Sequence, residues 1–270
     1  MPDLHREIVF ETEVIEHLTS NGWLAGDWQN YDRELAIYPE DLIWWLKETN
    51  AKDWNKLPIK TDEEKEKVLI SRACAEMNDK GSLQVLRHGF KHLNAKFGVC
   101  QFKPSHSLNA DVLGKYSKVR CRVVRQVHYS QDNGKSIDLV FFVNGIPVAT
   151  AELKTDFTQN VNDAIRQYRH DREPKDKVTK HEEPLLAFKK RALVHFAVSS
   201  DEVYMATELR GSDTFFLPFN LGYEEGAGNP PNPKGYRTSY LWEEVLERDN
   251  LLKILGRFVH LERLRCQYTE

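Results

Sequence analysis

The sequence has no apolar run that approaches the roughly 20 residues of a membrane-spanning helix, and its first residues, MPDLHREIVF, lack the apolar segment of a secretion signal. We therefore expect a cytoplasmic protein with no membrane partner. Cysteine is scarce: the four residues are Cys74, Cys100, Cys121 and Cys266, and no two of them form a CxxC pair. This spacing argues against a zinc ribbon and against a disulfide framework, so we expect reduced thiols in or near the core.

Motifs for nucleotide binding are also missing. The sequence contains no G-x-x-x-x-G-K-[ST] and no G-x-G-x-x-G, so this chain has no phosphate loop for ATP or a dinucleotide. It has no G-x-S-x-G elbow of a serine hydrolase, no internal repeat and no low-complexity tract. What remains is a chain of 270 residues with 40% hydrophobic and 29% charged side chains, the composition of one large globular domain or two small ones.

The net charge of −3 hides an uneven distribution. Residues 1–50 hold eleven acidic and three basic side chains, whereas residues 81–131 hold nine basic side chains and one acidic one, Asp111. A basic segment in an acidic protein can bind a polyanion such as nucleic acid, because phosphate neutralisation supplies sequence-independent affinity. Alternatively, the two segments face each other in the fold, and charge alone does not decide between these interpretations.

Helical spacing occupies much of the first hundred residues. The predicted elements are an amphipathic helix with Phe10, Val14 and Leu18 on one face and Asn21-Gly22 as its stop, a tryptophan-rich helix over 41–48, a helix over 61–77 that begins with Thr61 and Glu64 at capping-box spacing, and a continuation through Leu83, Leu86, Phe90 and Leu93.

From Val119 the period changes to two, which is typical of a strand. Arg125 falls on the apolar face of this strand, a costly position for a guanidinium unless it is paired or faces a site. Two apolar runs, 137–143 and 148–154, follow, and Asn144-Gly145 between them is the strongest short hairpin signal. The remaining predicted elements are a helix over 161–168, a buried strand over 192–198, a loop rich in Gly, Pro and Asn after 210, and a final helix over 241–264.

The sharpest group of polar residues is Asp138 followed by Glu152-Leu153-Lys154. Residues two apart in a strand share a face, so Glu152 and Lys154 project side by side while Leu153 points into the opposite layer. Two neighbouring strands can supply the carboxylates that Mg²⁺ binds, and a lysine beside them can orient a water or offset phosphoryl charge. This is the layout of a metal-assisted phosphodiester hydrolase. The alternative is that Glu152 and Lys154 form a solvated edge or a mutual salt bridge.

The hairpin geometry adds a condition. If Asn144-Gly145 forms a plain two-residue turn, Asp138 pairs with Ala151, and Asp138 and Glu152 then lie on opposite faces. A shared site therefore predicts a one-residue offset in the hairpin. Pro147, which cannot donate a ladder hydrogen bond, is a natural place for that offset.

Further polar candidates lie on two helices. Gln167 is on the flank of an apolar helix face and can reach the carboxylates, while Arg166 and Arg169 line the other flank and can meet phosphates. The alternatives are an ordinary boundary glutamine and a solvated charged face, which is the favoured interpretation of the arginines. Glu11 and Glu13, on the first helix, can add a carboxylate to the site, but exposure is favoured for both.

These residues lie within a longer pattern. The run from Arg125 to Arg172, with IDLVFFVNGIPVATAELK and NDAIRQYRHDR, resembles the N-terminal endonuclease region of the motor (R) subunit of type I restriction enzymes, a branch of the PD-(D/E)XK nuclease superfamily. The segments FAVSSDEVYMATEL, GAGNPPNPKGYRTSYLWEEVL and LLKILGRFV are also similar to that family, so the resemblance covers residues 85–260. It implies a restriction-endonuclease-like α/β fold, with a mixed central sheet flanked by helices and inserted N-terminal helices.

The resemblance also implies roles for single residues. Asp138 and Glu152 would bind the catalytic Mg²⁺, with the backbone carbonyl of Leu153 as a further ligand, and Lys154 would be the catalytic lysine. Gln167 matches the glutamine of the family's helix motif and would act in or beside the active site.

Two further positions relate to this pattern. The tyrosine that often follows the helix-motif glutamine by four residues is Asp171 here, and Tyr168 is adjacent to the glutamine instead. Arg125-Gln126 falls on a family-like pair, which gives Arg125 a reason to lie near the site. The residues that would contact DNA in this interpretation are Arg125, Arg166 and Arg169, although a solvated face is favoured for the two arginines of the helix.

We therefore expect Mg²⁺-dependent hydrolysis of DNA phosphodiester bonds. The implied partners are double-stranded DNA and the modification and specificity subunits of a type I restriction complex. In the family an ATP-driven translocase follows the nuclease, so ATP would be bound only by motor domains absent from this chain. We expect residues 1–209 to form the endonuclease domain and residues 210–270 a C-terminal extension that packs on it and leads toward the motor.

Two other hypotheses stay open. The first is a catalytically idle module that guides DNA or docks subunits, against which the intact Asp138, Glu152 and Lys154 argue. The second is a repair or resolvase-type nuclease of the same superfamily, against which the family-like C-terminal third argues.

Overall fold

The computed structural model describes residues 2–104, 109–155 and 160–261, with the backbone alone for residues 2–6. Within these ranges, a mixed seven-stranded sheet forms the centre of the molecule. Its order is β1 (Trp23–Gly26), β4 (Cys121–His128), β5 (Ser136–Val143), β6 (Ile146–Leu153), β7 (Val194–Val198), β8 (Val203–Ala206) and β9 (Leu217–Pro218). β1 pairs with β4 and β6 pairs with β7 in parallel, while the other neighbours are antiparallel. A separate ribbon pairs β2 (Phe90–His92) with β3 (Ala95–Phe97).

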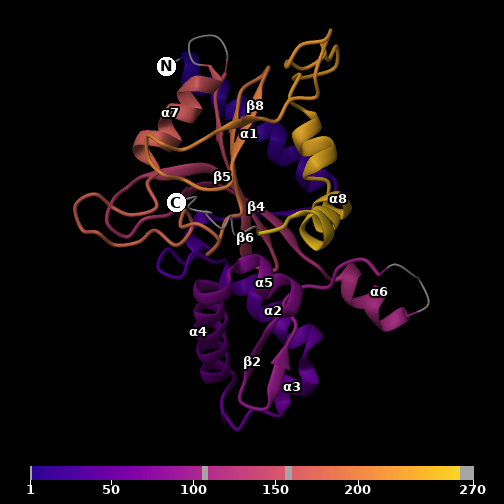
Figure 1. Ribbon diagram of the computed structural model, residues 1–270. Coiled ribbons are helices and arrows are strands. Elements are labelled where there is room, and N and C mark those ends of the chain that lie inside the picture. Colours follow the sequence, from indigo (N-terminus) through magenta and orange to yellow (C-terminus); the bar gives the residue numbers. More distant parts are fainter. Residues whose placement is uncertain (1, 105–108, 156–159, 262–270) are drawn as a thin grey trace, which may run out of the picture.

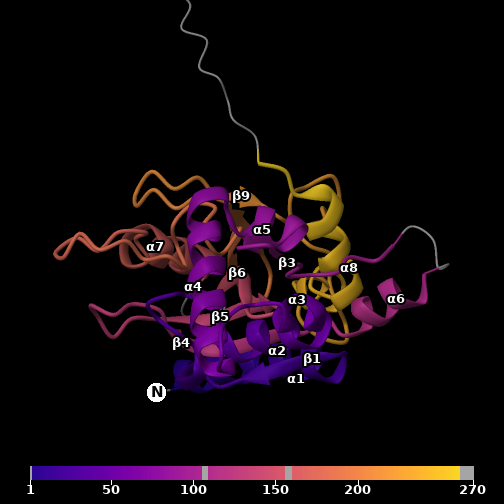
Figure 2. The ribbon, with the colours of Figure 1, turned by 90° about the horizontal axis from the view of Figure 1, so that it is seen from below.

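Helices cover both faces of the sheet and form a lobe below it (Figure 1). They are α1 (Pro2–Ser20), α2 (Pro39–Thr49), α3 (Ala51–Asn55), α4 (Asp62–Lys80), α5 (Ser82–His88), α6 (Ala110–Ser117), α7 (Val161–Asp171), α8 (Arg248–Lys253), the short 3-10 helix η1 (Trp28–Asn30), and the π-helical turns η2 (Leu241–Val245) and η3 (Ile254–Phe258). α7 packs on β6, β7 and β8, whereas α1 packs along β1 and against η2. The lobe combines α2–α5 with the β2-β3 ribbon, and α6 stands away from the sheet (Figures 1 and 2). The predicted α/β class, with a mixed sheet and inserted N-terminal helices, is thus confirmed.

The central strands are buried on both sides. Phe141 of β5 belongs to the core cluster that includes Phe10 of α1, whereas Phe142 belongs to the cluster that includes Tyr168 of α7. Because successive side chains of a strand point to opposite faces, a strand between two helical layers is apolar throughout. Any charged side chain in β5 or β6 therefore needs a partner or a ligand.

The Asn144-Gly145 turn has the predicted hairpin geometry, because both residues have positive φ, 48° and 81°. The turn is also held inside the protein. Asn144 is fully buried and its side chain donates a hydrogen bond to the Val99 carbonyl over 2.8 Å. A Cβ atom on Gly145 would lie 2.3 Å from the Tyr38 carbonyl oxygen, so only glycine fits there.

The predicted one-residue offset in the hairpin is confirmed. Phe142 pairs with Pro147 while Phe141 pairs with Ala149, so Val148 is an extra residue in β6. Such a β-bulge shifts every following pair by one position. Beyond it, Leu139 pairs with Ala151, which is the register that a shared site required.

The acidic N-terminal segment faces the basic segment, so the second interpretation of the charge pattern is confirmed. Asp41 of α2 is fully buried and accepts hydrogen bonds from Arg120 over 3.0 Å and from the Arg122 Nε over 2.6 Å. Lys118 pairs with Glu48 over 3.0 Å. Much of the positive charge of residues 81–131 therefore stabilises the fold.

Two predicted helices differ in the structure. The helix predicted to continue through Leu93 ends at His88, because Gly89 has φ 66° and a Cβ atom there would lie 2.0 Å from the Phe97 carbonyl oxygen. Phe90 then enters the β2-β3 ribbon.

The helix predicted over 241–264 is broken between Val245 and Arg248. Glu247 has a non-helical backbone there, and its side chain accepts hydrogen bonds from the backbone N–H groups that begin α8. The helical part ends at Phe258, and residues 262–264 lie outside the described residues. The three cysteines in the described ranges, Cys74, Cys100 and Cys121, are free thiols, whereas Cys266 lies outside those ranges.

Candidate active site

Asp138 and Glu152 lie opposite each other on β5 and β6. Leu139 pairs with Ala151. The residue before Leu139, Asp138, and the residue after Ala151, Glu152, therefore lie side by side on one face. The backbone N–H of Leu153 donates a hydrogen bond to Asp138 Oδ2 over 2.8 Å. The bulge at Val148 therefore brings the two predicted metal ligands together at one end of the sheet.

The Glu152 carboxylate is fully buried. Its Oε1 accepts a hydrogen bond from Arg172 Nε over 2.6 Å, whereas its Oε2 has no hydrogen-bond partner among the described residues. Burial raises the pKa of Glu152 well above its ordinary value, and the nearby Asp138 carboxylate adds to this, while Arg172 and Lys154 act in the opposite direction. A buried oxygen without a partner is costly unless a proton or a ligand satisfies it.

Lys154 does not form a salt bridge with Glu152 among the described residues. Its ammonium lies 3.4 Å from Glu7 Oε1 on α1, and its side chain is almost buried. The alternative of a solvated edge or a mutual Glu152–Lys154 salt bridge is therefore wrong, because Glu152 is enclosed and pairs with an arginine from another element.

A third carboxylate reaches the site from α1, and the expectation that Glu11 is exposed is wrong. Glu11 is 4% exposed. The Gln126 side-chain amide bridges it to the site, donating to Glu11 Oε2 over 3.1 Å and to Asp138 Oδ1 over 3.2 Å. Burial raises the pKa of Glu11, which hydrogen bonding by Gln126 and the charge of Arg125 oppose.

The local backbone of β4 explains how these groups meet. Gln126 has φ 48°, an uncommon value for a residue other than glycine. Val124 and Val127, three residues apart, both join the core on the α7 side, so the strand's alternation reverses at Gln126. Arg125 precedes this kink and lies on the same side as Val123, toward α1, where its Nε lies 2.7 Å from Glu11 Oε1. Arg125 is thus paired, as its position on an apolar face required.

The predicted helix residues lie on α7. Gln167 is half-buried, and within the described ranges its side chain makes no hydrogen bond to Asp138, Glu152 or any other residue. Arg166 is exposed and pairs with Asp163. Arg169 donates two hydrogen bonds to the Thr214 carbonyl, over 3.1 and 3.0 Å, which occupies much of its guanidinium.

A buried hydrogen-bond chain fixes α7 on the sheet next to Glu152. The Tyr168 hydroxyl lies 2.8 Å from Thr150 Oγ1, which lies 2.8 Å from His195 Nδ1. Burial lowers the pKa of His195 to about 3, so this imidazole is neutral near pH 7. This hydrogen-bond chain is therefore uncharged, and it sets the position of α7, the helix that leads to Arg172.

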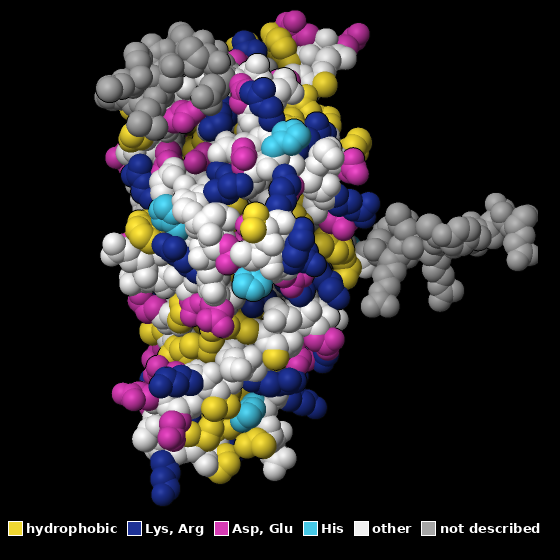
Figure 3. All heavy atoms as spheres, turned by 90° about the vertical axis from the view of Figure 1, so that its left-hand side faces the viewer, with side chains coloured by type: hydrophobic (Ala, Val, Ile, Leu, Met, Phe, Trp, Pro, Cys, Tyr) yellow, Lys and Arg dark blue, Asp and Glu magenta, His cyan; other side chains and the backbone are white. Residues whose placement is uncertain are grey.

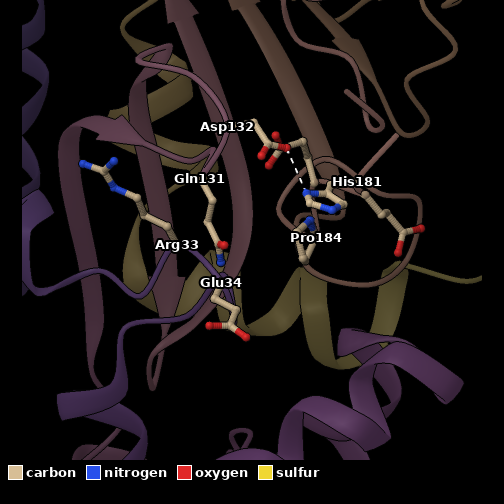
Figure 4. A pocket seen from close by; sticks show the side chains of 8 residues that line it. Arg33, Glu34, Gln131, Asp132, His181 and Pro184 are labelled. Atoms are coloured by element: carbon tan, nitrogen blue, oxygen red, sulfur yellow. Dashed lines mark hydrogen bonds and ion pairs between the residues drawn. The ribbon is translucent and has the colours of Figure 1, made fainter. Parts of the chain in front are cut away.

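Another acidic group lies apart from these residues. Carboxylate oxygens of Asp132, Asp176 and Glu183 lie within 4.8 Å of one another. Their neighbours already satisfy them: Ser130 donates to Glu183 over 2.5 Å, and backbone N–H groups of residues 178 and 179 donate to Asp176. This cluster borders a pocket of about 310 Å³, shown in Figure 4, in which His181 faces Asp132 across 3.2 Å.

The mixed sheet with helices on both faces, and with carboxylates and a lysine at one end of its central hairpin, is consistent with the restriction-endonuclease-like fold. The chain belongs to the family of the type I restriction enzyme R protein N terminus, whose family model matches residues 10–214. No curated protein matches the chain. None of the helices in the described ranges has the length and hydropathy of a membrane span.

Proposed function

We propose that this chain is the Mg²⁺-dependent endonuclease domain of a type I restriction enzyme R subunit and hydrolyses phosphodiester bonds of double-stranded DNA. The observation that carries the proposal is the opposed pair Asp138 and Glu152, with the Glu152 Oε2 atom buried and without a partner. Family membership supports the assignment to a restriction enzyme.

The residues present fit a Mg²⁺ ion. A hard divalent cation takes oxygen ligands from one or two carboxylates and keeps several waters. Asp138, Glu152 and the backbone carbonyl of Leu153 would hold it, and a bound cation would offset the cost of the buried Oε2 atom. Bound Mg²⁺ supplies Lewis-acid stabilisation of the charge that develops on the phosphoryl oxygens.

Lys154 is the proposed catalytic lysine. Its ammonium is tethered by Glu7 over 3.4 Å, a long ion pair that leaves donors free. Near the scissile phosphate it would orient the attacking water and offset negative charge as that water attacks phosphorus and the bond to the leaving oxygen breaks. Gln167 would help to position the substrate from α7.

DNA would be held mainly by backbone phosphates. Figure 3 shows the side of the molecule on the left of Figure 1, where Lys and Arg side chains gather in the middle with acidic side chains among them. Arg125, with a side chain 44% exposed, and Arg166, 69% exposed, are the better placed of the proposed DNA-binding arginines. Arg169 would have to release the Thr214 carbonyl to take part.

We further propose that residues 1–209 form the nuclease domain and that residues 210–270 extend it toward the motor. In support, Trp242 and Leu252 join the same core cluster as Phe10 of α1. The modification and specificity subunits would be partners of the complete complex, and ATP would bind only to motor domains outside this chain.

The test is cleavage of supercoiled plasmid by the wild type and by Glu152→Gln in Mg²⁺ and Mn²⁺. The proposal predicts nicked and linear DNA from the wild type, none from the variant, and equal thermal stability within a few degrees. Cleavage that persists in Glu152→Gln would place the chemistry elsewhere. If the chain alone cleaves DNA slowly, the same comparison is made in the active complex with its partner subunits.

A further inference from the structure

The two oxygens of Glu152 have different neighbours, and this difference points to a role for Arg172. Oε1 receives Arg172 Nε at 2.6 Å, whereas Oε2 has no partner in the described part of the chain. A carboxylate held through one oxygen cannot rotate freely, so its other oxygen points in a fixed direction. Asp138, on the neighbouring strand, lies on the same side.

Arg172 is itself held in place. It follows the last residue of α7 and is 6% exposed. The Tyr129 hydroxyl donates a hydrogen bond to the carbonyl of Asp171 over 3.1 Å, which anchors the chain just before Arg172 to the end of β4. The arginine therefore reaches Glu152 from a rigid base between two elements of the site.

We propose that Arg172 is a positioning residue that orients the Glu152 carboxylate toward the divalent cation. This inference rests on the proposed function and deepens it. Partners of metal ligands fix ligand orientation, and their removal typically costs 10–100-fold in metal affinity. Arg172 occupies one oxygen and leaves the other for the metal, so it holds the ligand without competing for the ligating atom.

A purely structural role is the alternative, in which Arg172 only ties the end of α7 to the sheet. Arg191 offers a matched control. It is also almost completely buried, but its hydrogen bonds go to the carbonyls of Leu35 and Lys190 and to the side-chain oxygen of Asn78, so it does not touch the site. Arg172→Met and Arg191→Met each remove a buried guanidinium, and only the first removes it from a proposed metal ligand.

The experiment measures Mn²⁺ affinity by electron paramagnetic resonance of the free ion, with unfolding temperatures in the same buffer. Arg172→Met is expected to weaken binding by about 10–100-fold, Arg172→Lys to recover most of that loss, and Arg191→Met to bind as wild type while losing thermal stability. An Arg172→Met protein with wild-type affinity, or with no recovery by Arg172→Lys, would overturn the positioning role.

Tighter Mn²⁺ binding by Arg172→Met would also overturn it, because Arg172 would then compete with the cation. If Arg172→Met does not fold, Arg172→Gln, which keeps a donor without the charge, replaces it under the same criteria. The proposed function has its own test. If Asp138→Ala removes no Mn²⁺ site from the wild type, both the proposed function and the role of Arg172 are refuted. If the wild type and the Arg172 variants bind Mn²⁺ equally, only the role of Arg172 is refuted.

Discussion

The backbone N–H of Leu153 donates a hydrogen bond to the carboxylate of Asp138 across the β5-β6 hairpin, over 2.8 Å. This single contact links the residue between Glu152 and Lys154 to the opposing carboxylate. It depends on the register after Val148, because without that extra residue Asp138 would face Ala151 instead. The placement of Asp138 beside Glu152 thus depends on a local irregularity in the sheet.

Glu11 should contribute to the site through its charge. Glu11→Gln keeps the shape of the side chain but removes a carboxylate that Gln126 bridges to Asp138. We expect Mn²⁺ affinity to fall by less than in Glu152→Gln, with the fold retained. Glu13→Gln, at an exposed position on the same helix, is the matched control and should bind as wild type. Equal Mn²⁺ affinities in the wild type, Glu11→Gln and Glu13→Gln would show that Glu11 does not contribute to the site.

Metal binding should depend on pH in a range above that of ordinary carboxyl groups. Burial raises the pKa values of Glu152 and Glu11 above 4.5, the ordinary value for a glutamate, and only the deprotonated forms bind a cation. Affinity for Mn²⁺ should therefore weaken as the pH falls through the raised pKa values. Calorimetry across pH 5–8 in buffers of different ionisation enthalpy would also detect the released protons, and a pH-independent affinity would contradict the assignment.

The same shift has a consequence for stability without metal. A carboxyl group with a folded-state pKa above its unfolded value stabilises the fold at low pH, and this contribution is lost as the pH rises through the folded-state pKa. The stability of the metal-free wild type relative to Glu152→Gln should therefore decrease from about pH 4.5 upward. Urea unfolding at several pH values measures the difference, and an increase with pH would show that Arg172 outweighs burial at Glu152.

Asp41 should matter for stability and not for metal binding. It is fully buried between Arg120 and Arg122, and Asp41→Asn leaves both guanidinium groups without their carboxylate. Breaking a buried ion pair from one side costs about 3–5 kcal/mol. We expect a loss of this size in the free energy of unfolding, with unchanged Mn²⁺ affinity in the folded variant. A loss below about 1 kcal/mol would place this pair with ordinary surface salt bridges.

Gly145→Ala should destabilise the hairpin on which the site is built. Alanine is strained at φ 81°, and its Cβ would meet the Tyr38 carbonyl at 2.3 Å. Substitutions at incompatible positive φ values cost more than about 1 kcal/mol. Chemical denaturation gives the measure. Gly134→Ala, where a Cβ would meet nothing within 4 Å, is the control, and equal stability of the two variants would contradict the close packing of the turn.

The hairpin could be predicted from the sequence because its signals are local. Asn144-Gly145 specifies the turn, and the offset followed from requiring Asp138 and Glu152 on one face. The burial of Glu11 could not be predicted, because its polar partner Gln126 lies on a distant strand and has a positive φ, which has no sequence signature comparable to glycine.

Arg172 was missed for a related reason. It lies 20 residues from Glu152 in sequence and meets it only once α7 is docked, a contact that no periodicity encodes. The break before α8 was also missed, because the capping glutamate Glu247 sits within an otherwise helical pattern and caps α8 through its side chain.

The central claim is that Asp138 and Glu152 hold a divalent cation. Isothermal calorimetry of Mg²⁺ and of Mn²⁺ into the wild type and into Asp138→Ala, with DNA cleavage followed in the same buffers, tests it most directly. The account predicts binding heats in the wild type that disappear in Asp138→Ala, whether or not the chain cuts DNA without its partner subunits. Equal heats in both proteins, with no cleavage, would contradict it and favour a catalytically idle module.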